Sequence, residues 1–422
     1  MNCKVLDKII EDNKDIIEKI IKSNGNIYLV GGAVRDILLN EKIKDLDFCI
    51  CNMEKETFEG LFPLAKLTGK AFPVYTYRGM EFAFARKERC IGKSHKDFNL
   101  YVDKNISIEE DLKRRDITIN SIAIDLKNKK VIDPFGGIED LRKKVIRHTS
   151  SAFVEDPNRA YRVARFASRY NFIVKDETID LIANMKENLN LVPAEVIFKE
   201  LSKVLESKTP SVFFEVLKKA NVLDVHFKEL NNLIGVIQPE KYHPEGDAFN
   251  HTMKVIDKVS KENVNTEIVF ASLTHDFGKA LTQNKYLPHH IDHDKNGVAL
   301  VENFCIRLKA PKKYLKIAKF VCLNHMRFSR YNEMKFSKKI DMLESIEKSN
   351  ITLHEMEIII NADNSMIPRE KILFAKEGRK VLDKINGKYI IEKYGAFEDI
   401  NKFKEKLREE RIKYIKKLYN FK

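Results

Sequence analysis

Apolar residues near the N-terminus recur at three- and four-residue spacing, which predicts an amphipathic helix over residues 5–21 that stops near Gly25. Strand-like runs separated by turns follow at 27–30, 46–50, 74–77, 81–85 and 119–126. From about residue 144 onward the pattern is almost wholly helical, with Lys- and Glu-rich faces. The pattern therefore predicts a small α/β domain followed by a long helical region.

The overall charge indicates a class of partner but no chemistry. The 422 residues carry a formal net charge of +14, which favours a polyanionic partner. Six scattered cysteines without a CxxC pair argue against a disulfide framework and a Cys-rich zinc site. No apolar run approaches the ~18 residues of a membrane span. We therefore expect a cytoplasmic protein without a membrane partner.

A glycine pair lies between a predicted strand and a predicted helix, where backbone N–H groups can approach a phosphate. Gly31 and Gly32 form the pair, and Arg35 follows one turn later. The next strand-like segment carries Asp45 and Asp47, whose spacing places both carboxylates on one face, where they can hold Mg²⁺. An ordinary turn and a solvated strand edge would explain each segment alone, but together they indicate a metal-dependent nucleotide site.

Two further segments place arginines beside carboxylates. Arg115, which can bind phosphate, precedes Asp116, which can accept a hydrogen bond from a ribose 2′-OH, but a charged surface turn explains this segment better when it is taken alone. Later arginines recur at steps that align them on one face of a helix. They are Arg159, Arg162, Arg165 and Arg169.

Asp156 and Pro157 precede this helix and fit an N-cap and first-turn pair, so a capped basic helix is one interpretation. The other concerns nucleobases. Cytosine and adenine share an exocyclic amino group beside an unprotonated ring nitrogen, which Asp156 and Arg159 match with an acceptor and a donor. Such an edge would select C and A without a template.

These segments resemble the class II tRNA nucleotidyltransferases of the DNA polymerase beta superfamily, especially the bacterial multifunctional CCA-adding enzymes. Residues 29–36 with the Asp pair match the first motif, 114–116 the ribose motif and 155–159 the base-reading motif, while 193–200 resembles the neck helices. The resemblance spans nearly the whole chain. It implies an α+β fold, in which a small mixed-sheet nucleotidyltransferase head precedes an all-helical neck, body with HD domain, and tail. The expected bounds are 1–143 for the head, 144–235 for the neck and start of the body, 236–365 for the HD domain and 366–422 for the tail.

The resemblance also implies residue roles. Asp45 and Asp47 would bind Mg²⁺ and catalyse nucleotide transfer from CTP and ATP to the 3′ end of tRNA. The nucleotide-binding residues would be Gly31, Gly32, Arg35, Arg115, Asp116, Asp156, Arg159, Arg162 and Arg165. Residues 85–105 occupy the position of a flexible loop that A addition needs, which favours addition of the complete CCA.

Seven of the eleven histidines lie between residues 243 and 325. Within this region His275 and Asp276 are adjacent, and with His251 and a distant Asp they can form an N/O site for a divalent transition metal. A helix end with an incidental histidine is the simpler alternative, but it does not explain the clustering.

This stretch resembles the HD phosphohydrolase domain of the multifunctional enzymes, which implies phosphatase and 2′,3′-cyclic phosphodiesterase activity. The implied ligands are His251, His275, Asp276 and Asp363, with Ni²⁺ as one candidate metal, while His289, His290 and His293 are candidates for another metal or for phosphate. Met326 follows His325 where the resemblance leads us to expect an acidic residue, which puts the catalytic competence of the site in question.

We therefore expect template-independent CCA addition by a monomer or homodimer that binds tRNA, CTP and ATP and releases pyrophosphate. A poly(A) polymerase with the same head motifs is one alternative. A phosphohydrolase or RNA-binding protein with an inactive head is another. The Lys- and Glu-rich tail is more simply a solvated helical face than an RNA clamp.

Overall fold

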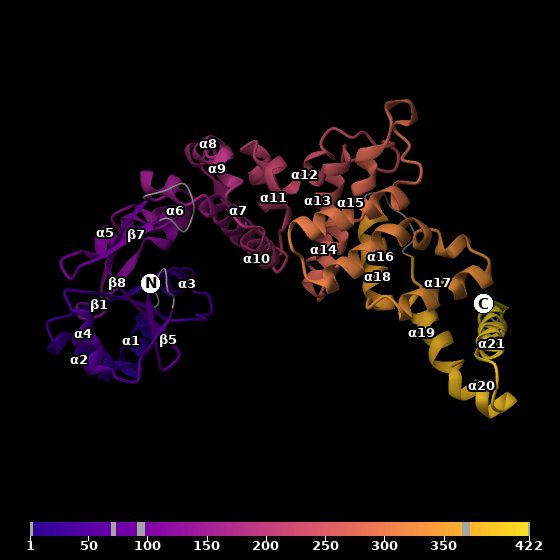
Figure 1. Cartoon of the computed structure of the whole chain (residues 1–422), viewed down its shortest axis with the longest axis horizontal. Helices are drawn as coiled ribbons and strands as arrows, with labels where there is room; N and C mark the ends of the chain where they lie inside the picture. The colour runs from indigo at the N-terminus through magenta and orange to yellow at the C-terminus, as the bar shows by residue number, and fades with distance from the viewer. Residues whose placement is uncertain (1–2, 69–72, 91–97, 365–371, 421–422) are drawn as a thin grey trace. The chain divides into compact units, whose positions relative to one another are not determined.

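The computed structural model describes residues 3–68, 73–90, 98–364 and 372–420. The chain divides into two compact units, one of residues 1–200 with 212–225 and the other of residues 201–211 with 226–422. Figure 1 shows strands in the first unit and helices along the rest of the chain. The predicted α+β class is confirmed, whereas the four-domain division stays a prediction. Among the described residues, no helix is long and apolar enough to cross a membrane.

A seven-stranded mixed sheet forms the centre of the first unit, in the order β3-β4-β5-β2-β1-β8-β9. Its strands are β1 (Asn26–Val30), β2 (Asp47–Cys51), β3 (Lys66–Thr68), β4 (Val74–Tyr77), β5 (Met80–Phe84), β8 (Ala123–Asp125) and β9 (Lys130–Ile132). Within the sheet β2 and β5 run parallel, and Asp47 lies opposite Glu81 in their register. Strands β6 (Arg86–Cys90) and β7 (Phe98–Val102) form a separate antiparallel pair, and residues 91–97 of the predicted flexible loop lie outside the described residues.

Helices cover the sheet and follow it along the chain. Those of the first unit are α1 (Cys3–Asp12), α2 (Lys14–Lys22), α3 (Gly32–Leu39), α4 (Lys55–Leu61), α5 (Ile108–Lys113), α6 (Gly137–Lys143), α7 (Asn158–Tyr170), α8 (Asp176–Asn184) and α9 (Lys186–Leu189). Next come α10 (Ala194–Val204), α11 (Ser211–Lys219) and α12 (Leu223–Asn231), which contain the crossings between the units. The short strands β10 (Val145–Ile146) and β11 (Ile173–Val174) pair beside α7.

Four local predictions were wrong. The helix predicted over 5–21 is two helices, because Asn13 has non-helical dihedrals and its side chain donates to the Ile9 carbonyl. The strand predicted over 119–126 begins as a 3-10 turn and becomes β8 only at Ala123. Asp45 precedes β2 instead of lying on it. The N-cap of α7 is Pro157, while Asp156 accepts the N–H of Asn158.

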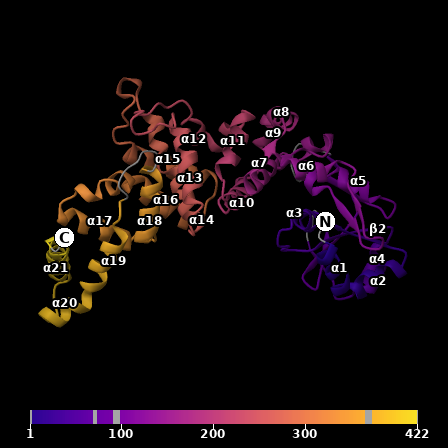
Figure 2. The ribbon, with the colours of Figure 1, turned by 180° about the vertical axis from the view of Figure 1, so that it is seen from behind.

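The second unit is helical throughout its described residues. Its helices are α13 (Ala248–Val259), α14 (Thr266–Thr274), α15 (His293–Arg307), α16 (Lys312–Phe328), α17 (Phe336–Glu347), α18 (Leu353–Asp363), α19 (Ala375–Lys384), α20 (Gly387–Tyr394) and α21 (Ile400–Asn420). Figure 2 shows α13, α14, α16 and α18 side by side, and α14 contacts the other three. At Gly278 an added Cβ would lie 1.9 Å from the His293 carbonyl oxygen, so glycine lets the segment after α14 reach the start of α15.

A buried lysine ties the C-terminal helix to the rest of this unit. Lys339 of α17 is 2% exposed, and its Nζ lies 4.3 Å from the ring centre of Tyr419 on α21 and 4.7 Å from that of Tyr331. The same nitrogen donates to the Tyr419 hydroxyl at 2.6 Å. Aromatic faces attract a desolvated cation, so this contact stabilises the docking of α21.

We expect Lys339→Ala to loosen α21, because it removes the cation, its hydrogen bond and the packing of its stem, together worth about 1–3 kcal/mol. Hydrogen exchange resolved by peptide would show faster exchange in α21 with little change in the sheet. The neighbouring Lys338→Ala is the matched control, because the Lys338 side chain is 65% exposed. Equal exchange in both variants would show that the buried lysine does not dock α21.

Candidate functional site

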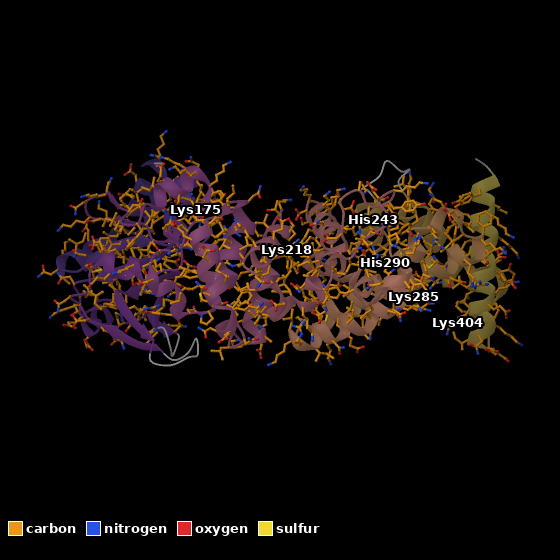
Figure 3. The ribbon with its side chains drawn as sticks, turned by 90° about the horizontal axis from the view of Figure 1, so that it is seen from above. Lys175, Lys218, His243, Lys285, His290 and Lys404 are labelled. Carbon is orange, nitrogen blue, oxygen red and sulfur yellow. The ribbon has the colours of Figure 1, made fainter. Side chains whose placement is uncertain are left out.

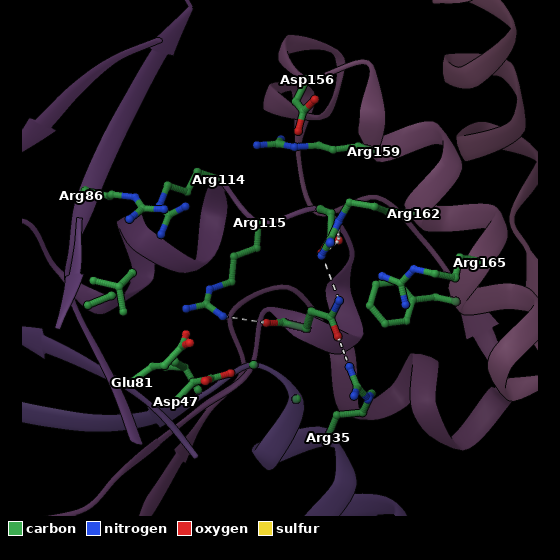
Figure 4. A pocket seen from close by; sticks show the side chains of 18 of the residues that line it. Arg35, Asp47, Glu81, Arg86, Arg114, Arg115, Asp156, Arg159, Arg162 and Arg165 are labelled. Atoms are coloured by element: carbon green, nitrogen blue, oxygen red, sulfur yellow. Dashed lines mark hydrogen bonds and ion pairs between the residues drawn. The ribbon is translucent and has the colours of Figure 1, made fainter. Parts of the chain in front are cut away.

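All nine predicted nucleotide-binding residues line one pocket of about 460 Å³ in the first unit (Figure 4). The Gly-Gly turn, the β2 and β5 strands and one side of α7 form its walls. Among the described residues its charged lining consists of Arg35, Arg86, Arg114, Arg115, Arg159, Arg162, Arg165, Arg169, Asp47, Glu81, Asp116 and Asp156. This excess of guanidinium groups over carboxylates favours a polyanionic ligand.

The Gly-Gly turn brings the N-terminus of α3 to this pocket. Gly31 has φ 68°, in the left-handed region, where a side chain would be strained. A Cβ there would also lie 3.4 Å from Arg115 Nη1 and 3.6 Å from Asp47 Oδ2. The turn therefore places the N–H groups at the start of α3 next to an acid and an arginine, which suits a phosphate.

Two carboxylates meet where β2 and β5 run side by side. Burial raises the pKa of Asp47, and the charges of Glu81 and Asp45 raise it further, while Arg115 opposes them. This excess of carboxylate oxygens fits Mg²⁺, which prefers oxygen ligands. The sequence prediction missed Glu81, and its only signal is an acid near the start of a strand after a tight turn. Asp45 lies close enough for its charge to raise the pKa of Asp47. Among the described residues that line the pocket, however, Asp45 is absent.

Several pocket arginines are held in place by buried partners. Arg162 contacts Asp116 Oδ2 at 2.7 Å. Burial raises the pKa of Asp116, but Arg162 and the Asn120 amide lower it by more, so the pKa is about 2. Arg35 is 4% exposed, donates to Asn120 Oδ1 and lies 5.1 Å from the ring centre of Tyr170. Arg35 and Arg162 are thus fixed before any ligand arrives.

The base-reading pair predicted from the sequence lies on the α7 side of the pocket, as Figure 4 shows. Arg159 is 6% exposed, and its Nη1 donates to the Ala152 carbonyl at 2.7 Å. One turn beyond Arg162, Arg165 donates to Glu200 Oε2 of α10 at 2.5 Å. Glu200 was predicted only as part of a neck helix, and the sequence carried no signal of this pairing.

The histidine-rich region folds into a second site, in the second unit. His251 on α13, His275 and Asp276 after α14, and Asp363 at the end of α18 place one ligand atom each within 4.8 Å of one another. His251 Nε2 lies 3.0 Å from Asp363 Oδ1, and His275 Nε2 lies 3.2 Å from Asp276 Oδ2. We call these four residues the HD cluster.

A second ligand group shares Asp276 with the HD cluster. His293 Nε2 and His325 Nε2 lie 3.3 and 3.5 Å from Asp276 Oδ1, and 3.1 Å from each other. The Nδ1 atoms of His275, His293 and His325 each lie within hydrogen-bond distance of a backbone carbonyl oxygen. Each Nδ1 therefore carries the proton when the ring is neutral, which leaves Nε2 as a ligand.

Buried polar atoms without hydrogen-bond partners test whether this site fits a cation. In the described part of the chain, both Asp276 oxygens and His275 Nε2 are buried without a partner of hydrogen-bond geometry, although Lys279 Nζ lies 2.6 Å from Asp276 Oδ2. Burial lowers the pKa of His275, but Asp276 and Asp363 outweigh it and hold the pKa at about 10. These carboxylates therefore favour a positive charge here, and a metal cation would displace the second proton from Nε2. Imidazole and carboxylate groups whose buried atoms lack hydrogen-bond partners fit a divalent transition metal.

Other predictions for this region had mixed outcomes. Of His289, His290 and His293, only His293 places a ligand atom in a described group, while the His290 ring contacts Thr282 and the Ile237 carbonyl. Neither ligand group that contains Asp276 includes residue 326. Both groups therefore form although position 326 is Met and not the acidic residue that the resemblance led us to expect. The sequence prediction missed Glu245, whose Oε1 lies 2.6 Å from His251 Nδ1 and orients that ring.

Two family models match parts of this chain, and curated proteins match about three quarters of it. Residues 27–147 match the family described as the poly A polymerase head domain, and residues 171–234 match one described as a probable RNA and SrmB-binding site of polymerase A. The multifunctional CCA protein of Mannheimia succiniciproducens is 41% identical over 333 residues, covering 76% of this chain and 78% of that protein. Its namesake from Neisseria gonorrhoeae is 39% identical over 326 residues, with the same coverages.

Solved structures share the fold. A CCA-adding enzyme in complex with ATP is 21% identical with a TM-score of 0.64, covering 97% of this chain and 91% of that one. The Thermotoga maritima CCA-adding enzyme in complex with tRNA is 22% identical with a TM-score of 0.63, at the same coverages. These identities show the fold alone, but the much closer match to the Mannheimia protein over three quarters of both chains shows descent, and the chain belongs to the family of multifunctional CCA proteins.

Proposed function

We propose that this protein adds and repairs the 3′-terminal CCA of tRNA, using CTP and ATP and releasing pyrophosphate. The observation that supports this most is the pocket in which the Gly-Gly turn, the Asp47–Glu81 pair and the α7 arginines meet. Relatives of the same family are named for CCA, and solved structures of the same fold hold ATP, CTP and tRNA. A poly(A) polymerase would use the same pocket, but it does not account for the second site.

The pocket residues divide the work of nucleotide transfer. The start of α3 and Arg115 bind the triphosphate, and Arg162, fixed by Asp116, contacts the nucleotide from α7. Asp47, Glu81 and Asp45 would hold Mg²⁺, which when bound supplies charge neutralisation at the phosphates and acidifies the attacking hydroxyl. The tRNA 3′ oxygen forms a bond to the α-phosphorus, the bond to the pyrophosphate oxygen breaks, and Asp47 is placed to accept the hydroxyl proton.

Asp156 and Arg159 select C and A by hydrogen bonding to the base. Asp156 would accept the exocyclic amino hydrogen, and Arg159, fixed by the Ala152 carbonyl, would donate to the neighbouring ring nitrogen. Uracil and guanine present a carbonyl and a ring N–H at these positions, so they leave both protein groups unpaired. The test is incubation of the protein with tRNA lacking its 3′ end, where addition of neither CMP nor AMP would overturn the proposal.

For the second site we propose phosphomonoester and 2′,3′-cyclic phosphodiester hydrolysis. His251, His275, Asp276 and Asp363 would hold a divalent transition metal, which when bound supplies Lewis-acid polarisation of the ester. A water oxygen bonds to phosphorus, one phosphorus–ribose oxygen bond breaks, and a proton passes to that ribose oxygen. Lys279, buried beside Asp276 and held by Gln238 Oε1 at 2.6 Å, is placed to bind the phosphate.

A further inference from the structure

Two segments that border the HD cluster carry the same short pattern. Lys241-Tyr242 precedes His243 and Pro244, and Lys285-Tyr286 precedes Leu287 and Pro288. In both segments the lysine Nζ lies over the tyrosine ring, at 5.6 Å from the ring centre of Tyr242 and 4.8 Å from that of Tyr286. The nucleotide-transfer pocket uses neither segment.

Hydrogen bonds link the first segment to His251 of the HD cluster, and link a histidine that follows the second segment to His293. His243 Nδ1 lies 3.2 Å from Glu245 Oε1, the carboxylate that also contacts His251. His290, four residues after Tyr286, contacts the carbonyl of Ile237, four residues before Lys241, and the His290 carbonyl accepts from His293 Nδ1. Figure 3 shows His243, His290 and Lys285 close together in the view from above. Each lysine–tyrosine pair therefore lies within four residues of a histidine that contacts the residues around the metal ligands.

Large aromatic and aliphatic side chains are exposed in and beside the two segments. Tyr242 is 43% exposed and Tyr286 is 45% exposed. Other large apolar side chains before or after the two segments along the chain are also exposed, namely Ile234, Ile237, Leu281 and Ile291. Exposed aromatic rings beside lysines, next to a site that fits phosphate chemistry, match the way proteins bind single-stranded nucleic acid, where rings stack on bases and cations contact phosphates.

We propose that Tyr242 and Tyr286 are stacking platforms for unpaired bases at the 3′ end of an RNA whose terminal phosphate ester enters the HD cluster, with Lys241 and Lys285 on its backbone phosphates. The proposal rests on the hydrolase function proposed for that cluster. Two platforms make an oligonucleotide end a better substrate than a mononucleotide, because a mononucleotide has one base to stack.

The test compares an oligoribonucleotide ending in a 2′,3′-cyclic phosphate with glycerol 2-phosphate, an ester that has neither a base nor an aromatic ring. Each of Tyr242→Ala and Tyr286→Ala should raise KM for the RNA by about tenfold, as loss of one stacked base predicts, and Tyr→Phe should restore it. Hydrolysis of the baseless ester should change by less than about twofold. Tyr394→Ala is the matched control, because Tyr394 is 40% exposed beside Lys393 in another part of the unit.

A second measurement keeps the two proposals separable. An oligoribonucleotide with 4-thiouridine at its 3′ end should photocrosslink to peptides containing Tyr242 or Tyr286, and the alanine variants should lose these crosslinks. If the wild-type protein hydrolyses neither ester but crosslinks there, the hydrolase proposal fails and the RNA surface stands. Absence of these crosslinks, or equal effects of the variants on both esters, would overturn the RNA surface.

Discussion

Asp47→Asn is expected to reduce incorporation of CMP and AMP into tRNA by at least about 10²–10³-fold, because it removes a charged group placed to hold Mg²⁺ and accept the hydroxyl proton. The fold should be unaffected, because Asn has nearly the same shape as Asp and lacks the charge that repels Glu81 and Asp45. Hydrolysis of phosphate esters should be unchanged, since the HD cluster lies in the other unit.

Two companion variants sharpen this result. Glu81→Gln should also reduce incorporation of CMP and AMP into tRNA. This result would assign a function to a residue that the sequence motifs did not identify. Asp180→Asn on α8 is the matched control, because Asp180 is exposed and remote from the pocket lining. Incorporation by Asp47→Asn at the wild-type rate would contradict the proposed role of this acid pair.

The second large effect is expected from His275→Ala. It should abolish hydrolysis of 2′,3′-cyclic phosphates and lower the amount of bound divalent metal, because His275 is fully buried and its Nε2 faces Asp276 and Asp363. CMP incorporation should remain. Activity assays and metal content measured by mass spectrometry on the same preparation would check both expectations.

His354→Ala provides the control for this variant, because the His354 side chain is 71% exposed on α18, the helix that also carries Asp363. It should retain both metal and activity. If His275→Ala kept its metal and its hydrolysis, the HD cluster would not be the hydrolytic site.

Local spacing predicted those parts of the site that lie on one element. The arginine steps placed Arg159, Arg162 and Arg165 on one side of α7, where all three line the pocket. The Gly-Gly pair predicted a strand-to-helix turn, and Gly31 shows why only glycine fits its backbone. Helical and strand periods govern these features directly.

Contacts between distant elements could not be predicted in this way. Glu81 joins Asp47 only because β2 and β5 pair in parallel, and Glu200 meets Arg165 only because α10 packs against α7. Asp276 was predicted as a ligand, but the approach of His293 and His325 to its second oxygen depends on how α15 and α16 pack. Such pairings are set by tertiary packing, about which a single sequence carries little information.

The central claim is that this pocket selects C and A and stops after CCA. Its most direct test is to sequence the 3′ ends formed on tRNA that lacks CCA when CTP, ATP, UTP and GTP are all present with Mg²⁺. The account predicts ends that finish in CCA, without U or G. Long A tails, mixed nucleotides or unextended ends would contradict it.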